Sequence, residues 1–179
     1  MNIMKMTKKL KWKSVSAVLA GGLMLFAMPG PLLAADTPPT LPQVQQMMKK
    51  VQGTVFPIGT YNSQYAPYFT GHTYLAPLTT GGVPIANVTF INGAHTFWHV
   101  HHGTCQILVA ESGHGYYQIW GQEPQKLEPG QTVTIPEGVK HWHGAAPGSM
   151  FQHLSIMEPT QSSTEWMEPV SASDYQKLK

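Results

Sequence analysis

The sequence predicts a single all-β domain, a sandwich or barrel, with a short helix near each end. From residue 55 onward, the 179-residue chain is built of short runs rich in β-branched and aromatic residues. Turn dipeptides such as Asn92-Gly93 and Pro129-Gly130 separate these runs. No segment between them has the length and 3.6-residue periodicity of a helix. An alternating α/β fold is therefore excluded.

Six segments have the composition of β-strands, and each is bounded by turn residues. Because successive side chains of a strand point to opposite faces, residues two apart share a face. The strands are expected at residues 84–91, 95–101, 106–110, 116–120, 132–135 and 151–157.

Two short helices are predicted outside the strand region. The first opens at Pro42 and ends near Gly53, with apolar residues at i, i+3, i+4 and i+7 on one face. The second begins after Ser171, which can cap a turn that has Asp174 three residues on. The inward residues are Val44, Met47, Met48 and Val51 in the first helix, and Tyr175 and Leu178 in the second.

Residues 1–35 predict a secretory signal peptide. A lysine-rich start is followed by an apolar run over residues 14–28 and by small residues at Ala34 and Ala35. Glycine and proline interrupt the run, which is shorter than the roughly 20 residues of a membrane-spanning helix. Cleavage near Ala35 is therefore expected, with export to the periplasm or medium of a bacterium. Residues 36–54 then form a linker and short helix, and residues 55–179 form the domain.

The net charge changes sign without this leader. The chain has 11 lysines, no arginine and 9 acidic residues, but five lysines lie in the first 13 residues, so 6 against 9 leaves −3. A negative domain without arginine has no basic surface for phosphates, which excludes nucleic-acid binding. With Cys105 as the single cysteine, no internal disulfide can form.

The nine histidines all lie between residues 72 and 153. On a strand, His99 and His101 share a face, as do His141 and His143. Imidazoles that converge from neighbouring strands form a metal site or a general-base cluster. His102 is expected to face outward, and the histidines without such context, His72, His95 and His114, are expected at the surface or in loops.

Two motifs resemble those of the cupins. The first is Gly93-x5-His99-x-His101-x4-Gln106-x6-Gly113, and the second is Gly130-x5-Pro136-x-Gly138-x2-His141. The resemblance covers roughly residues 71–178 and implies a single-domain cupin, a jelly-roll β-barrel. Two positions depart from the family pattern: Gln106 replaces an acidic ligand, and Ala145 replaces an asparagine.

Further segments are similar to one cupin subgroup, which includes manganese-dependent bacterial hydroxynitrile lyases and carboxymuconolactone-decarboxylase-associated cupins. They are residues 98–103, 140–147, 153–154 and 165–168. The resemblance implies one divalent metal ion, manganese first and iron or zinc as alternatives. It implies His99, His101, Gln106 and His141 as metal ligands, with His143 and His153 as unligated histidines of the active site.

Three neutral imidazoles and an amide oxygen leave the charge of a divalent ion uncompensated, which makes it a stronger Lewis acid. This mixed set suits Mn(II), Fe(II) or Zn(II). Cys105 is the rival of Gln106, because the motif tolerates either spacing after His101. Adjacent strand residues face opposite ways, so only one of the two reaches the metal.

His143 and His153 are the catalytic candidates, because one can remove a proton from a substrate hydroxyl while the other orients or shuttles it. The alternative for His143 is that it fixes the tautomer of a ligand. Ala86, Val88, Met157 and Trp142 are expected to line a small apolar substrate pocket. Without arginine, such a pocket suits a small, uncharged or weakly acidic oxygenated substrate.

The resemblance implies a metal-dependent enzyme that acts on a small oxygenated molecule. The leading hypothesis is a hydroxynitrile-lyase-like reaction, with C–C cleavage at a metal-bound hydroxyl. One alternative is a metal-dependent dioxygenase, an oxidoreductase, and another is a non-catalytic metabolite-binding cupin. The expected partner is a small-molecule substrate, with no nucleic acid and no stable membrane insertion after cleavage. A homodimer or homotetramer is expected.

Overall fold

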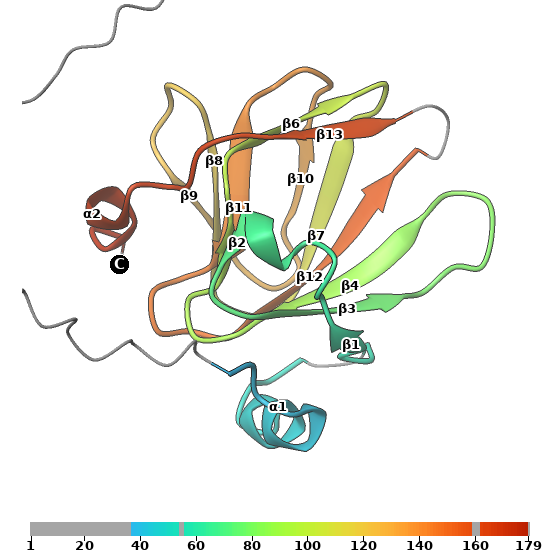
Figure 1. Ribbon diagram of the computed structural model, residues 1–179, viewed down its shortest axis with the longest axis vertical. Coiled ribbons are helices and arrows are strands. Elements are labelled where there is room, and N and C mark those ends of the chain that lie inside the picture. The colour runs from blue at the N-terminus through green and yellow to red at the C-terminus, as the bar shows by residue number, and fades with distance from the viewer. Residues whose placement is uncertain (1–36, 54–55, 159–161, 179) are drawn as a thin grey trace, which may run out of the picture. The chain divides into compact units, whose positions relative to one another are not determined.

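The computed structural model describes residues 37–53, 56–158 and 162–178. The predicted signal peptide lies outside the described residues. Two antiparallel sheets face each other and form a barrel, as Figure 1 shows. The all-β class predicted from the strand pattern and the jelly-roll barrel implied by the cupin resemblance are confirmed.

The first sheet has six strands. Their order across the sheet is β1 (Thr60–Tyr61), β3 (Thr73–Pro77), β4 (Ile85–Phe90), β12 (Phe151–Met157), β7 (Gln106–Gly113) and β10 (Thr132–Ile135). The late strand β12 lies between two earlier ones, β4 and β7. This crossover places His153 of β12 beside Val88 of β4 and Ala110 of β7.

The second sheet carries most of the histidines. Strand β11 (His141–Ala145) pairs along one edge with β5 (His95–Thr96) and β6 (His99–His102), and along the other edge with β8 (Gly115–Ile119). The outer strands are β13 (Ser163–Trp166), which pairs with β6, β2 (Phe69–Thr70), which pairs with β5, and β9 (Gln125–Leu127), which pairs with β8.

The predicted strand at 95–101 is wrong as a single element, because the chain leaves the ladder at Phe97 and Trp98 and forms β5 and β6 separately. Both strands nevertheless pair with β11, at opposite ends of it. Short strands that have no long apolar run of their own, β1, β2, β3, β9 and β13, were not predicted.

Apolar side chains from both sheets form the core between them. Strand β7 alternates buried and partly exposed residues, so Leu108 and Ala110 face inward on the same side as Gln106. They pack with Phe90 and Phe151. This alternation fixes which side chains of β7 reach the interior.

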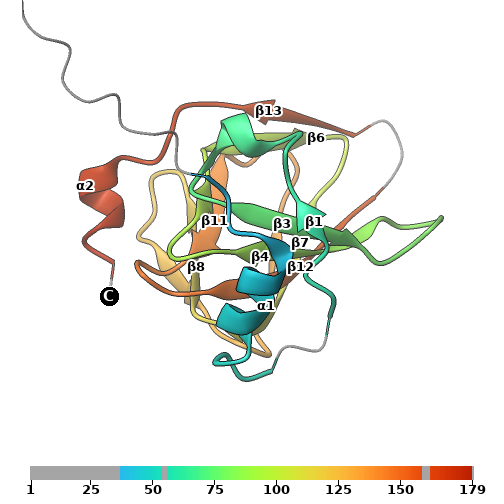
Figure 2. The same ribbon diagram turned by 60° about the horizontal axis from the view of Figure 1, so that its bottom comes forward.

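Both predicted helices are present, but the first ends at Met48 and not near Gly53 as predicted. Helix α1 (Leu41–Met48) follows Thr40, whose backbone N–H donates to the Gln43 side chain over 2.7 Å, and it buries Val44 and Met48. Figure 2 shows α1 against the lower end of the barrel. Among the described residues, no helix is long and apolar enough to cross a membrane.

Helix α2 (Ala172–Tyr175) ties the C-terminal segment to the barrel. The Tyr175 hydroxyl lies 2.7 Å from the carbonyl oxygens of Gly93 and Ala145. His95 stacks on the Tyr175 ring at a centroid distance of 3.9 Å and is buried. The expectation that His95 lies at the surface is therefore wrong, because the C-terminal segment covers it.

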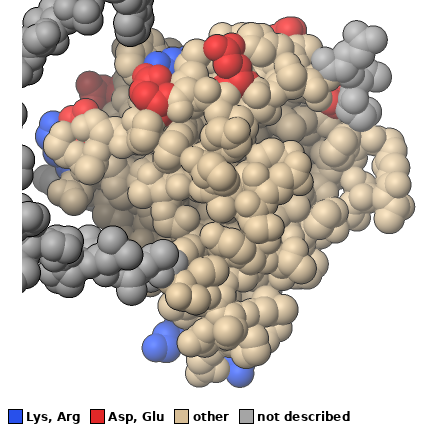
Figure 3. Space-filling view, viewed as in Figure 1, with Lys and Arg blue, Asp and Glu red and all other residues tan. Residues whose placement is uncertain are grey.

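Charged side chains are sparse on the face of the barrel seen in Figure 3. Acidic side chains gather toward the end formed by β6 and β13, and basic ones lie both beside them and at the opposite end, near α1. This distribution agrees with the low proportion of charged residues, 11% of the sequence.

Candidate metal centre and adjoining pocket

Three imidazoles meet where β6 and β11 pair. His99 and His141 are direct cross-strand partners, and His101 lies two residues along β6 on the same face. One ring nitrogen from each of the three lies within 4.8 Å of the others, and all three residues are buried. Of the two same-face pairs predicted from the sequence, both members of the first, His99 and His101, and one member of the second, His141, therefore meet at one point.

The outer ring nitrogens are held by hydrogen bonds. His99 Nδ1 lies 2.9 Å from the carbonyl oxygen of Phe97, and His141 Nδ1 lies 2.9 Å from that of Val139. A carbonyl oxygen can only accept, so each Nδ1 must carry the hydrogen. The Nε2 of each ring therefore has a free lone pair, which is the form that binds metal.

His101 is held in a different way. Its Nδ1 lies 3.1 Å from the hydroxyl of Thr164, which comes from the distant strand β13. Its Nε2 is buried and has no hydrogen-bond partner among the described residues. A buried polar atom without a partner is costly, which indicates that this nitrogen serves a ligand.

Gln106 supplies a fourth donor. Its Nε2 donates to the Ser155 hydroxyl over 3.0 Å, so the amide oxygen points toward the histidines. That oxygen lies 3.0 Å from His141 Nε2. Since this nitrogen carries no hydrogen, two lone pairs face each other, a repulsive contact that a cation between them would relieve. The residues present thus fit a divalent ion.

Cys105 lies outside this cluster. Residues 105 and 106 are adjacent, and the inward face of β7 begins with Gln106. Cys105 is partly exposed and is not part of the group of potential ligands found among the described residues. The structure places the glutamine, and not the thiol, against the imidazoles.

The buried site keeps its imidazoles neutral. Burial lowers the pKa of His141 to about 4, and burial together with the neighbouring His141 lowers that of His99 well below its usual value. Burial also lowers the pKa of His101. Their lone pairs are therefore available for a metal at neutral pH.

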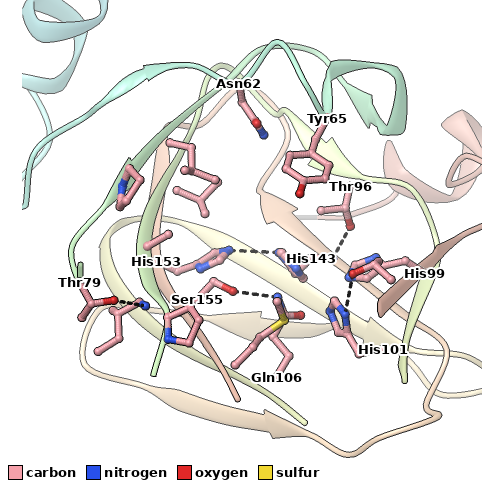
Figure 4. A pocket seen from close by; sticks show the side chains of 18 of the residues that line it. Asn62, Tyr65, Thr79, Thr96, His99, His101, Gln106, His143, His153 and Ser155 are labelled. Atoms are coloured by element: carbon pink, nitrogen blue, oxygen red, sulfur yellow. Dashed lines mark hydrogen bonds between the residues drawn. The ribbon is translucent and has the colours of Figure 1, made fainter. Parts of the chain in front are cut away.

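His143 and His153 form a pair beside this cluster. His153 Nε2 lies 3.1 Å from His143 Nδ1. Both residues are buried, and burial lowers the pKa of His153 to about 4 and that of His143 well below its usual value. Figure 4 shows the pair projecting into the cavity between the two sheets. Both rings are positioned to exchange a proton.

A cavity of about 510 Å³ adjoins these histidines. Ala86, Val88 and Met157 line it. No charged side chain is among its lining residues in the described part of the chain. The cavity is therefore suited to a neutral molecule.

The prediction that Trp142 lines this pocket is wrong. Trp142 lies between His141 and His143 on β11, so its side chain points to the opposite face of the strand. There it packs with Val170 and Tyr175 of the C-terminal segment. It lines a separate groove on the outside of the barrel.

The remaining histidines are peripheral to the cluster. His102 faces outward, as expected, and bonds to Glu165 over 2.9 Å. His114 is exposed and pairs with Glu128, also as expected. His72 is half-buried and does not line the cavity.

Several residues around the site were not predicted from the sequence. They are Asn62, Tyr65, Ser155, Thr164 and Trp166, all of which line the cavity. Trp166 of β13 lies 4.8 Å from the His99 ring, centroid to centroid. For Trp166 a signal existed, because residues 165–168 belong to the subgroup resemblance, whereas Thr164 lies just before that segment. Asn62 and Tyr65 follow no recognisable pattern.

A buried histidine cluster inside a jelly-roll barrel defines the class of protein. Residues 86–156 match the family model described as Cupin domain. The chain belongs to the cupin family.

Two relatives are similar over most of the domain. The (R)-mandelonitrile lyase of Granulicella tundricola is 38% identical over 117 residues, which cover 63% of this chain and 88% of that protein. The crystal structure of a cupin-like protein from Thermotoga maritima superposes with a TM-score of 0.63 at 34% identity, covering 69% of this chain and 96% of that one.

Proposed function

We propose that this protein is a metal-dependent lyase that cleaves a cyanohydrin of the mandelonitrile type into an aldehyde and hydrogen cyanide. The observation that carries the proposal is the meeting of three neutral imidazoles and the Gln106 amide oxygen beside the His143–His153 pair. The similarity to an (R)-mandelonitrile lyase supports this choice of reaction.

His99, His101, His141 and Gln106 would hold the ion, which when bound supplies a Lewis acid that polarises a substrate hydroxyl. The ligand set has no negative charge, so the full positive charge acts on the substrate. Buried Nδ1 hydrogen bonds keep the His99 and His141 rings in place. We propose manganese as the resident metal, with iron or zinc as alternatives.

The histidine pair provides the base. When His143 Nδ1 donates to His153 Nε2, the Nε2 of His143 carries a lone pair and can accept the hydroxyl proton of the substrate. The bond to the nitrile carbon then breaks, its electron pair leaves with cyanide, and the carbinol becomes a carbonyl group. Cyanide takes the proton back from the pair, which returns to its neutral form.

The cavity accounts for the class of substrate. Its lining has no charged side chain among the described residues, and Ala86, Val88 and Met157 provide apolar contacts. Away from the metal ligands, a charged group of a substrate would lose its hydration without gaining a partner of opposite charge. A neutral cyanohydrin keeps its polar end at the histidines and its apolar end against these side chains.

The test is metal analysis followed by a cleavage assay. The protein is purified, stripped with a chelator and reloaded with Mn(II), Fe(II) or Zn(II), and benzaldehyde release from mandelonitrile is measured with and without oxygen. We expect cleavage above the spontaneous rate only in the metal-loaded protein, and equal rates under both atmospheres. Turnover that requires oxygen would instead support a dioxygenase, and metal-loaded protein without turnover contradicts the proposal.

We also propose export and self-association. The lysine-rich, apolar and small-residue segments of residues 1–35 support a cleaved signal peptide. Detection of the protein in the periplasm or medium with an N-terminus near residue 36 tests export.

Sedimentation analysis of the mature protein tests the expected homodimer or homotetramer.

A further inference from the structure

A polar group lies in the cavity away from the histidines. Asn62 is only 7% exposed, yet it lines the cavity. Its backbone N–H donates to the carbonyl oxygen of Thr73 over 3.0 Å, and its Nδ2 donates to the Thr73 hydroxyl over 3.3 Å. Its Oδ1 has no hydrogen-bond partner among the described residues. Figure 4 shows the amide pointing into the cavity.

Tyr65 adds a second polar group to the same wall. It precedes the short helix η1 (Ala66–Tyr68), and it also lines the cavity. Figure 4 shows its hydroxyl directed into the cavity. This hydroxyl makes no hydrogen bond with any residue that the structure describes. The Tyr65 ring lies beside Trp166, which also lines the cavity, at a centroid distance of 6.3 Å.

These two groups are separated from the metal ligands. In Figure 4, Asn62 and Tyr65 lie across the cavity from Gln106. Apolar side chains such as Leu75 and Val88 also line the space. The cavity therefore has one polar end at the histidines and Gln106, an apolar wall, and a second polar region at Asn62 and Tyr65 on the opposite side.

We propose that Asn62 and Tyr65 form a subsite for a hydroxyl group at the end of the substrate remote from the reacting carbon. The inference rests on the proposed function and names its substrate class: neutral aryl cyanohydrins that carry a ring hydroxyl. A hydroxyl group has a hydrogen to donate to Asn62 Oδ1 and lone pairs to accept from the Tyr65 hydroxyl. The Asn62 oxygen is open to the cavity, so a substrate without this hydroxyl would displace water from it without replacing the lost hydrogen bond, which is the stronger discrimination.

The experiment compares mandelonitrile with its 3-hydroxy and 4-hydroxy analogues on the metal-loaded protein. We expect kcat/KM to be about tenfold higher for at least one hydroxylated analogue, the range that one or two neutral hydrogen bonds supply. In Tyr65→Phe, which keeps the ring, the ratio of hydroxylated to parent kcat/KM falls about fivefold, and in Asn62→Leu it falls at least as far. The matched control is Tyr68→Phe, an exposed tyrosine that stacks on Trp166 and does not line the cavity.

The result that overturns the subsite is a ratio near one in the wild type, or an unchanged ratio in Tyr65→Phe. Because Asn62 is buried and its variant can fail to fold, the Tyr65→Phe variant by itself is sufficient to test the subsite. Calorimetric binding of hydroxybenzaldehydes against benzaldehyde needs no turnover. Preferential binding without turnover supports the subsite and contradicts only the lyase, whereas turnover without preference contradicts only the subsite.

Discussion

His99 of β6 and His141 of β11 stand directly opposite each other in the ladder, and their imidazole rings lie 4.1 Å apart, centroid to centroid. Each ring has its Nδ1 held by the carbonyl oxygen two residues earlier in the chain, just before its strand begins, at Phe97 and Val139 respectively. The pair is therefore built from one local geometry used twice. Two backbone carbonyl oxygens are therefore enough to direct the Nε2 lone pairs of both rings to one point.

The first prediction concerns metal content. His101→Ala removes a buried nitrogen that has no partner among the described residues, so we expect loss of stoichiometric metal, measured by elemental analysis of purified protein. The matched control is His102→Ala, the next residue on the same strand, which faces solvent and should keep the metal. Equal metal in both variants contradicts the site.

The second prediction concerns the orientation of Gln106. Ser155→Ala removes the acceptor that holds the amide nitrogen, so the amide can flip and turn Nε2 toward the imidazoles. We expect metal affinity to fall about tenfold, as is usual for residues that orient a ligand. Competition with a chromogenic chelator measures it. Cys105→Ser serves as the control and should bind metal like the wild type.

The third prediction concerns strand β13. Thr164→Val keeps the side-chain shape but removes the hydroxyl that bonds to His101 Nδ1. Without that bond the His101 ring is no longer held in its orientation, and we expect metal affinity to fall about tenfold. The same titration compares it with Ser163→Ala, an exposed neighbour on β13. Wild-type affinity in Thr164→Val would show that β13 does not orient the ligand.

The fourth prediction separates metal binding from proton transfer. His153→Gln leaves the three histidines and Gln106 in place, so the metal content should match the wild type. An amide at residue 153 can still hydrogen-bond to His143 but cannot take up or release a proton as the imidazole does, so kcat/KM for mandelonitrile cleavage should fall about 100-fold or more. His114→Gln, at an exposed position, is the control. Retained activity in His153→Gln would remove His153 from the proton path.

The fifth prediction concerns acid stability of the metal-free protein. Burial lowers the pKa of His153 to about 4, whereas an unfolded histidine titrates near 6.5. Between these pH values the unfolded state binds more protons than the folded state. The contribution of His153 to the free energy of unfolding is therefore fully present above about pH 6.5 and is lost as the pH drops toward 4. The loss from this residue is about 2 kcal/mol at pH 5. Urea unfolding at pH 7.5 and 5 should show a correspondingly smaller loss in His153→Gln.

Strand periodicity was sufficient to predict much of the metal centre. It placed His99 with His101 and His141 with His143, and it put Gln106 and Cys105 on opposite faces of their strand. The same rule puts Trp142 on the outer face of β11, so its assignment to the pocket contradicted the periodicity. The outer face is buried as well, because the C-terminal segment covers it, and burial alone does not show which cavity a residue lines.

The residues that were missed reach the site through pairings between distant parts of the chain. Thr164 meets His101 from 63 positions away, and Ser155 meets Gln106 from 49 positions away. Asn62 and Tyr65 lie in a segment with little regular structure, so no periodicity indicated which way they point. His95 was misplaced for the same reason, since Tyr175 covers it from the far end of the chain.

The sequence by itself determined the all-β class, the two helices and the faces on which the histidines lie, because these depend on side-chain alternation and turn residues within a few positions. Only the tertiary structure decided that β6 and β11 pair at His99 and His141, that Gln106 turns its oxygen to them, and that Asn62 and Tyr65 close the other side of the cavity. The physical reason is that register, amide orientation and cavity shape arise from contacts between segments far apart in the chain, on which local propensity has no bearing.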